Sequence, residues 1–195
     1  MGNKMITKYK AIILFLLLHV SAFSQDLGKA YFAGGCFWCM EESFEKKDGV
    51  LEVISGYSGG TTKNPTYEEV TYGKTGHFET IEVIFDKNKI NYSNLLDHFW
   101  RNIDPFDEYG QFCDKGYSYR SVAFYESNEQ KNLIEQSIKK LEEKFERRIV
   151  TYVIKFERFY KAEEKHQNYY EVKFLNYLRY KKACGREKKL NKIWN

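Results

Sequence analysis

Segments with strand-like and helix-like patterns alternate along this chain, and this alternation constrains its fold more than any other feature. Apolar residues alternate over residues 79–85, so that Ile81 and Val83 share one face of a strand. Phe37 and Met40 instead begin a pattern with the spacing of a helix. Strands that alternate with helices in this way predict a two-layer α+β sandwich with a mixed β-sheet and flanking helices.

The individual elements are predicted from this periodicity and from the residues that start and stop helices. Strands are expected over residues 29–33, 50–55, 79–85, 121–125 and 149–156. Helices are expected from residue 37 to Gly49, from Asn64 and Pro65 through Val70, after Ser93, and after Ser127 with Gln130 in a capping box. An irregular stretch, 104–119, has a length that is often functional. A coil-rich C-terminal tail is expected after about Lys181.

The first 24 residues have the order of a secretory signal peptide. Three lysines come first, then the apolar run of residues 11–18, and then small residues. A transmembrane anchor needs about 20 apolar residues, whereas His19 and Ser21 interrupt this run much earlier. We therefore expect cleavage after Ser24, a single domain over residues 25–195, and a periplasmic or secreted protein.

The charge pattern argues against one class of partner. The net charge of +4 is modest, and the basic residues of the tail are not accompanied by any nucleic-acid recognition motif. The basic residues are therefore expected to form a solvated surface. We expect a monomer that has no nucleic-acid partner.

Four cysteines, at positions 36, 39, 113 and 184, are the main candidates for chemistry. Cys36 and Cys39 form a Cys-x-x-Cys pair after Gly34 and Gly35, where a predicted strand gives way to a predicted helix. The unpaired N–H groups and positive dipole end of a helix start stabilise a thiolate, so Cys36 is expected to be a nucleophile. A zinc site would need a second close Cys or His pair, which this sequence lacks, so no metal is expected. An exported thiol-disulfide oxidoreductase is the competing interpretation of the pair.

Seven motifs, the first of which contains Cys36, follow one another along the chain. They are residues 35–38 (Gly-Cys-Phe-Trp), 56–60 (Gly-Tyr-Ser-Gly-Gly), 64–67 (Asn-Pro-Thr-Tyr), 75–79 (Thr-Gly-His-Phe-Glu), 112–116 (Phe-Cys-Asp-Lys-Gly), 119–121 (Tyr-Arg-Ser) and 166–169 (His-Gln-Asn-Tyr). In this order they resemble the signatures of the A-type methionine sulfoxide reductases, the peptide-methionine (S)-S-oxide reductases. The resemblance implies an α+β sandwich with the nucleophile at a helix N-terminus. It also implies reduction of the S epimer of methionine sulfoxide, in proteins and as the free amino acid.

The resemblance implies catalytic roles for individual residues. Cys36 would attack the sulfoxide sulfur, and Glu79 would protonate the oxygen as a general acid if burial keeps its proton near neutral pH. Tyr67 and Tyr119 would donate hydrogen bonds to that oxygen. Asp114 would organise water and the polar end of the substrate.

The same resemblance implies an apolar side to the site. Phe37 and Trp38 would hold the S-methyl group, because sulfur and aromatic rings attract by up to ~1.5 kcal/mol. His166 is the remaining candidate for substrate binding. Its role is open between orienting the site and satisfying a core hydrogen bond.

Turnover would leave Cys36 as a sulfenic acid, with which a second thiol condenses to a disulfide. Cys184 is the first candidate for this resolving thiol, because it lies where the family commonly keeps one and Gly185 would let the tail move. Cys39 is the second candidate, since the Cys-x-x-Cys spacing permits a direct bridge. Cys113 is the third. A thioredoxin-like donor is then implied, and the sequence has no flavin or nicotinamide motif, so no cofactor is expected.

A function other than catalysis also stays open at this point. A secreted binding domain could use the aromatic pocket to hold methionine-containing peptides, with its four cysteines locked in structural disulfides. The two classes differ in one observable, since only the enzyme needs a free thiol at Cys36.

Overall fold

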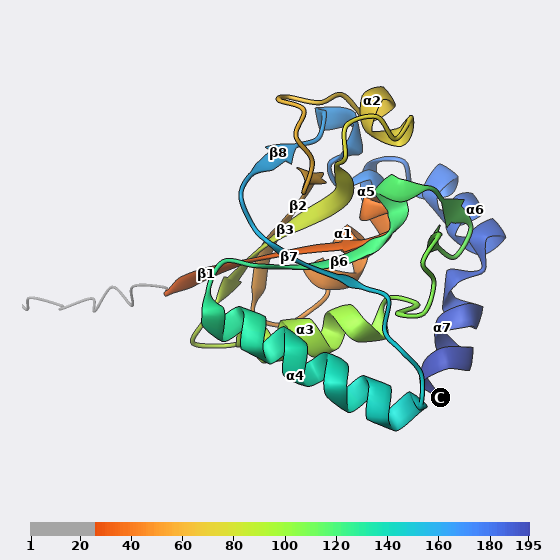
Figure 1. Cartoon of the computed structure of the whole chain (residues 1–195). Coiled ribbons are helices and arrows are strands. Elements are labelled where there is room, and N and C mark those ends of the chain that lie inside the picture. Colours follow the sequence, from red (N-terminus) through yellow and green to blue (C-terminus); the bar gives the residue numbers. More distant parts are fainter. Residues whose placement is uncertain (1–25) are drawn as a thin grey trace, which may run out of the picture.

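The computed structural model describes residues 26–195, and a six-stranded sheet forms their centre (Figure 1). Its strand order is β7-β6-β1-β3-β2-β8, with β1 (Leu27–Gly34), β2 (Val50–Ser58), β3 (Phe78–Asp86), β6 (Ser121–Tyr125), β7 (Tyr152–Lys155) and β8 (Phe159–Lys161). Strands β6 and β7 are parallel, while the other neighbours are antiparallel. The predicted α+β class with a mixed sheet is therefore confirmed. The predicted signal peptide, residues 1–24, lies outside the described residues.

Helices pack against one face of this sheet and complete the main core. They include α1 (Phe37–Glu45), α3 (Tyr92–Arg101) and α4 (Asn128–Phe145), the last two of which run together along the sheet (Figure 1). Phe44, Phe99 and Ile134 from these helices are fully buried with Phe32 of β1. A second, smaller cluster on Tyr31 and Phe124 is covered by the chain between β7 and β8. Burial of these apolar side chains is the main stabilising contribution to the fold.

Two predicted helix starts are wrong by a few residues. The helix α2 (Tyr67–Thr71) begins after Thr66, which forms a capping box with Glu69, rather than at Asn64. The helix α3 is capped by Asn91, whose side chain accepts from the Asn94 N–H, rather than by Ser93. In both cases two residues that can cap a helix N-terminus stand close together in the sequence. The helix begins after the residue whose side chain accepts from an unpaired backbone N–H of the first turn.

The later strands also differ from prediction. The segment predicted as one strand over 149–156 contains the shorter β7, and β8 was missed because three residues are too few for a periodic pattern. The predicted irregular stretch contains two short strands, β4 (Gly110–Gln111) and β5 (Asp114–Lys115), and the 3₁₀ helix η1 (Tyr117–Tyr119).

The C-terminal tail is helical, so the prediction of a coil-rich tail is wrong. It contains α5 (Tyr169–Val172), α6 (Phe174–Cys184) and α7 (Arg186–Trp194). Gly185, with φ of 66°, ends α6 in the left-handed conformation that favours glycine. The buried Arg186 guanidinium then donates to the carbonyls of Gly34 (3.2 Å) and Asn102 (2.5 Å). These bonds hold the tail against the end of β1.

Across residues 26–195, no helix combines the length and the apolar composition required to cross a membrane.

Candidate active site

The turn between β1 and α1 places Cys36 at the N-terminus of a helix, as predicted. Gly35 has a φ of 80°, and a Cβ atom there would lie 2.5 Å from the Cβ of Gln111. Position 35 therefore requires glycine, because any larger residue would be strained at this positive φ and would clash with Gln111. Cys36 is the N-cap residue of α1, and its carbonyl accepts from the N–H groups of Cys39 (3.1 Å) and Met40 (3.3 Å).

Antiparallel pairing brings distant residues to the same edge of the sheet. The C-terminal end of β1 lies beside the start of β3 on one side and the start of β6 on the other. Cys36 follows β1, Glu79 is near the start of β3, and Tyr119 precedes β6. Sheet topology therefore gathers side chains that are about 40 to 80 residues apart in the chain around one point.

These side chains line a cavity of about 240 Å³. Its walls are formed by Cys36, Phe37, Trp38, Tyr67, Glu79, Asp114, Tyr119 and Tyr180. Every residue for which the sequence predicted a role in the reductive step is present, and His166 is not among the lining residues. Tyr180 was missed, although Tyr177, Tyr180 and Cys184 have the spacing of one helix face.

The surroundings of the Glu79 side chain favour the protonated form of its carboxyl group. Its side chain is 2% exposed, and Oε2 accepts from the N–H of Phe37 at 3.0 Å. The other oxygen, Oε1, is buried and has no hydrogen-bond partner among the described residues. Burial raises the pKa of Glu79 to about 8, so the carboxyl group is protonated at neutral pH. The predicted condition for a general acid is met.

Two phenols face the same cavity as neutral hydrogen-bond donors. Burial raises the pKa of Tyr67 to about 12, and burial together with the nearby Glu79 raises the pKa of Tyr119 as well. Glu163 orients the first of them, because it accepts from the Tyr67 N–H (2.9 Å) and from the hydroxyl of Tyr57 (2.8 Å). Both phenols can therefore stabilise a developing oxyanion without titrating.

The apolar wall is a stack of aromatic rings. The ring of Trp38 stacks on Tyr169 at 3.9 Å between centroids. His166 lies behind the wall, 4.4 Å from the Tyr67 ring and 5.4 Å from the Phe37 ring. Neither of its ring nitrogens has a hydrogen-bond partner among residues 26–195. Its Nε2 lies 3.9 Å from Oε2 of Glu163, and the role of His166 in substrate binding stays a prediction.

Cys36 and Cys39 are free thiols and form a buried, coupled pair. Burial raises the pKa of Cys36 well above its usual value. A hydrogen bond from Cys36, helped by the Arg186 charge, lowers the pKa of Cys39 to about 7 despite burial. The opposite directions of the two pKa shifts favour the thiolate on Cys39 over the thiolate on Cys36 in the resting site.

The other two cysteines form a disulfide between Cys113 and Cys184, 71 residues apart. It joins the end of α6 to the loop that carries Asp114, with the two Cα atoms 5.0 Å apart. Cys184 is therefore neither free nor paired with Cys36 in this state. Its role as the resolving thiol stays a prediction.

Comparisons with known proteins agree with this geometry. The family model described as "Peptide methionine sulfoxide reductase" matches residues 28–195. The peptide methionine sulfoxide reductase MsrA of Bacillus velezensis is 46% identical over 167 residues, which cover 85% of this chain and 94% of that protein. Among solved structures, Mxr1 from Saccharomyces cerevisiae in reduced form has a TM-score of 0.71 and 28% identity, over 75% of this chain and 85% of that one. Mxr1 in complex with Trx2, at 23% identity over 73% of this chain and 84% of that one, has a TM-score of 0.53 and shows the fold alone. By the family match and the identity to its relative, the chain belongs to the peptide methionine sulfoxide reductase family.

Proposed function

We propose that this chain reduces the S epimer of methionine sulfoxide, in proteins and as the free amino acid, with Cys36 as its nucleophile. One observation carries the proposal: a single small cavity holds the Cys36 sulfur, a protonated Glu79 and two neutral phenols. An attacking sulfur, a proton source and oxygen-side donors are what sulfoxide reduction requires. Phe37 and Trp38 supply the aromatic surface for the S-methyl group.

The reductive step balances without any added cofactor. The Cys36 thiolate attacks the sulfoxide sulfur and forms a sulfur–sulfur bond, while Glu79 gives its proton to the sulfoxide oxygen. The resulting hydroxyl group then moves to the Cys36 sulfur as the sulfur–sulfur bond breaks, and the electron pair of that bond stays with the substrate sulfur. Cys36 is thereby oxidised to a sulfenic acid, and the substrate leaves as methionine, reduced by two electrons. Asp114 lies at the cavity beside these groups and is placed to organise the polar end of the substrate.

Turnover of the two separate sulfoxide epimers with dithiothreitol tests this function. We expect consumption of the S epimer only, because one class of enzyme serves each epimer. The measurement is methionine released from each epimer by the purified protein. Release from the R epimer alone would contradict the proposal.

For the second half of the cycle we propose that Cys39 resolves the sulfenic acid. The Cys39 thiol displaces the hydroxyl of the sulfenic acid as water and forms a Cys36–Cys39 disulfide. The two sulfurs are already in one buried cluster, whereas Cys184 is bonded to Cys113. Cys184 could act only after its own disulfide had been opened. A thioredoxin-like donor would then reduce the new disulfide by dithiol exchange, and Mxr1 has been solved in complex with Trx2.

Serine variants distinguish the two resolving thiols. Cys39→Ser is expected to keep the first turnover, which needs only Cys36, and to lose donor-dependent cycling by about tenfold or more. The matched control is the double variant Cys113→Ser, Cys184→Ser, which leaves no stray thiol and is expected to cycle at nearly the parent rate. The measurement is the ratio of single-turnover to steady-state rates with a thioredoxin donor. The reverse pattern would assign the step to Cys184.

Two other functions fit the site less well. A thiol-disulfide oxidoreductase needs little beyond its two cysteines, whereas this cavity adds a protonated Glu79 and two phenols that disulfide exchange does not use. A binding domain with all its cysteines in structural disulfides is disfavoured because Cys36 and Cys39 are free.

The pattern of residues 1–24 supports a proposal about location. We propose export to the periplasm or beyond, with the donor supplied by electrons passed across the membrane. N-terminal sequencing of the protein from its own cells should then begin at Gln25, and a chain that retains residues 1–24 would contradict this.

A further inference from the structure

Tyr180 is a third phenol at the reacting sulfur, and neither the sequence motifs nor the proposed reaction assign it a role. It lines the cavity together with Cys36 and Asp114. Its hydroxyl donates to Oδ2 of Asp114 at 2.5 Å, and its ring packs edge-on against Trp38, with 6.1 Å between centroids and an interplanar angle of 86°. The side chain is thus fixed at both its ring and its hydroxyl.

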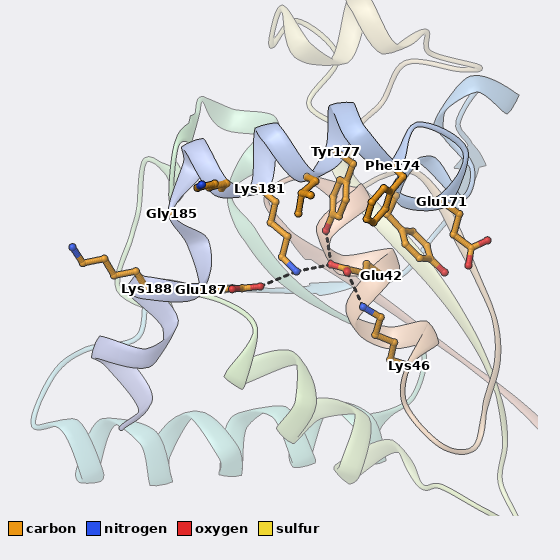
Figure 2. Close-up of a pocket in the computed structure, with 12 residues that line it drawn as sticks. Glu42, Lys46, Glu171, Phe174, Tyr177, Lys181, Gly185, Glu187 and Lys188 are labelled. Atoms are coloured by element: carbon orange, nitrogen blue, oxygen red, sulfur yellow. Dashed lines mark hydrogen bonds and ion pairs between the residues drawn. The ribbon is translucent and has the colours of Figure 1, made fainter.

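Hydrogen bonds to Glu42 hold α6, the helix that carries Tyr180, against α1. Figure 2 shows Tyr177 and Lys181 of α6 directed at Glu42 of α1. The Tyr177 hydroxyl donates to Glu42 at 2.6 Å and the Lys181 ammonium at 2.8 Å. Lys46, the C-cap residue of α1, donates to the other oxygen of the same carboxylate at 2.7 Å. Tyr177 and Tyr180 of the same helix pack with Cys36 and Cys39 in one cluster.

A disulfide also fixes the C-terminal end of α6. The disulfide at Cys184, the last residue of α6, ties this helix to the loop of Asp114. Tyr180 therefore lies between two fixed points, the Glu42 cluster and the disulfide. A side chain held in this way can keep one geometry at the sulfur through the reaction.

The Tyr180 hydroxyl can act as a hydrogen-bond donor to the Cys36 sulfur. Burial raises the pKa of Tyr180 far above its usual range, so its hydroxyl remains a donor. Burial, Cys39 and Glu79 all raise the pKa of Cys36, whereas a hydrogen bond from Tyr180 lowers it. A donor next to a buried thiolate stabilises the charged form that attacks.

We propose that Tyr180 is a further catalytic residue, whose hydroxyl donates to the Cys36 thiolate and holds that sulfur toward the bound sulfoxide. The inference rests on the proposed role of Cys36 as the nucleophile. In the resting site the same hydroxyl donates to Asp114, and ionisation of Cys36 draws the hydrogen bond to sulfur. Tyr180 thereby offsets part of the cost of forming a charged nucleophile in a buried cavity.

Alkylation of Cys36 over a range of pH, without any sulfoxide present, tests the proposal. In Tyr180→Phe the pH midpoint of Cys36 alkylation by iodoacetamide is expected to rise by about one unit, since a charge-assisted hydrogen bond is lost. The rate at neutral pH should fall about tenfold accordingly. Peptide mass spectrometry separates the label on Cys36 from that on Cys39. Phenylalanine keeps the ring against Trp38, so the packing of α6 is preserved.

Two control variants make the result specific. Tyr170→Phe removes a phenol that donates to Glu45 of α1 and does not line the cavity, and its midpoint should match the parent. Asp114→Asn should not raise the midpoint, because it removes a negative charge from the site.

An unchanged midpoint in Tyr180→Phe would overturn the proposal. An equal rise in Asp114→Asn would also overturn it, since Tyr180 would then act only through Asp114. A shifted midpoint in a protein that reduces no sulfoxide would refute the proposed function but not the Tyr180 hydrogen bond.

Discussion

Replacing Cys36 with serine is expected to abolish sulfoxide reduction, with a loss of about 10⁴-fold or more in the single-turnover rate. A serine hydroxyl stays protonated, and its oxygen cannot accept the sulfoxide oxygen in the way that the Cys36 sulfur does when it becomes a sulfenic acid. Cys39 cannot replace it, because its side chain does not line the cavity. The measurement is methionine formed in a single turnover by reduced enzyme in excess over a sulfoxide peptide.

Cys39→Ser is the matched control for this experiment. It removes the neighbouring thiol of the same coupled pair, yet the first turnover should survive because Cys36 remains in the cavity. If Cys36→Ser still reduced the peptide while Cys39→Ser did not, the nucleophile would have to be reassigned to Cys39.

Elements with strong local signals could be predicted from the sequence. The pattern around Ile81 and Val83 is a strand because alternating apolar residues bury one face, and β3 forms over that pattern. The start of α1 could be predicted because Gly34 and Gly35 end β1 and leave Cys36 at the first turn. In both places a few adjacent residues determine the backbone.

The tail could not be predicted because its helices depend on distant contacts. Local periodicity in α6 is weak, since Phe174, Leu175 and Leu178 remain exposed. What holds the helix is a set of bonds from Tyr177 and Lys181 to Glu42, more than 130 residues earlier in the chain. Tertiary contacts of this kind override weak local propensity, and no local pattern reveals them.

Residues of the candidate site could be predicted where they belong to recognisable sequence motifs. Glu79 and Tyr119 stood inside motifs that resemble a known family. Tyr180, one of 16 tyrosines, stood in no such motif and was marked only by its helical spacing from Cys184. The pairing of Cys113 with Cys184 was equally hidden, because a separation of 71 residues gives no local signal. Such pairs become visible only when the fold brings the side chains together.

Glu79→Gln should slow the reductive step by about 10²-fold or more while substrate binding is retained, because an amide of the same shape has no proton to give. Burial raises the pKa of Glu79 to about 8, so the acid form is present below that pH and is lost above it. Ionisation of Cys36 affects the parent and Glu79→Gln alike, so the ratio of the parent single-turnover rate to that of Glu79→Gln should fall as pH rises through about 8. Glu41→Gln is the matched control: Glu41 is also fully buried, with a pKa raised to about 7 by burial, yet it does not line the cavity. The ratio of the Glu41→Gln rate to the Glu79→Gln rate should fall with pH in the same way as the parent ratio does. Single-turnover rates in Glu79→Gln that equal those of the parent across this pH range would remove Glu79 from the reaction and leave the sulfoxide oxygen without its proton source.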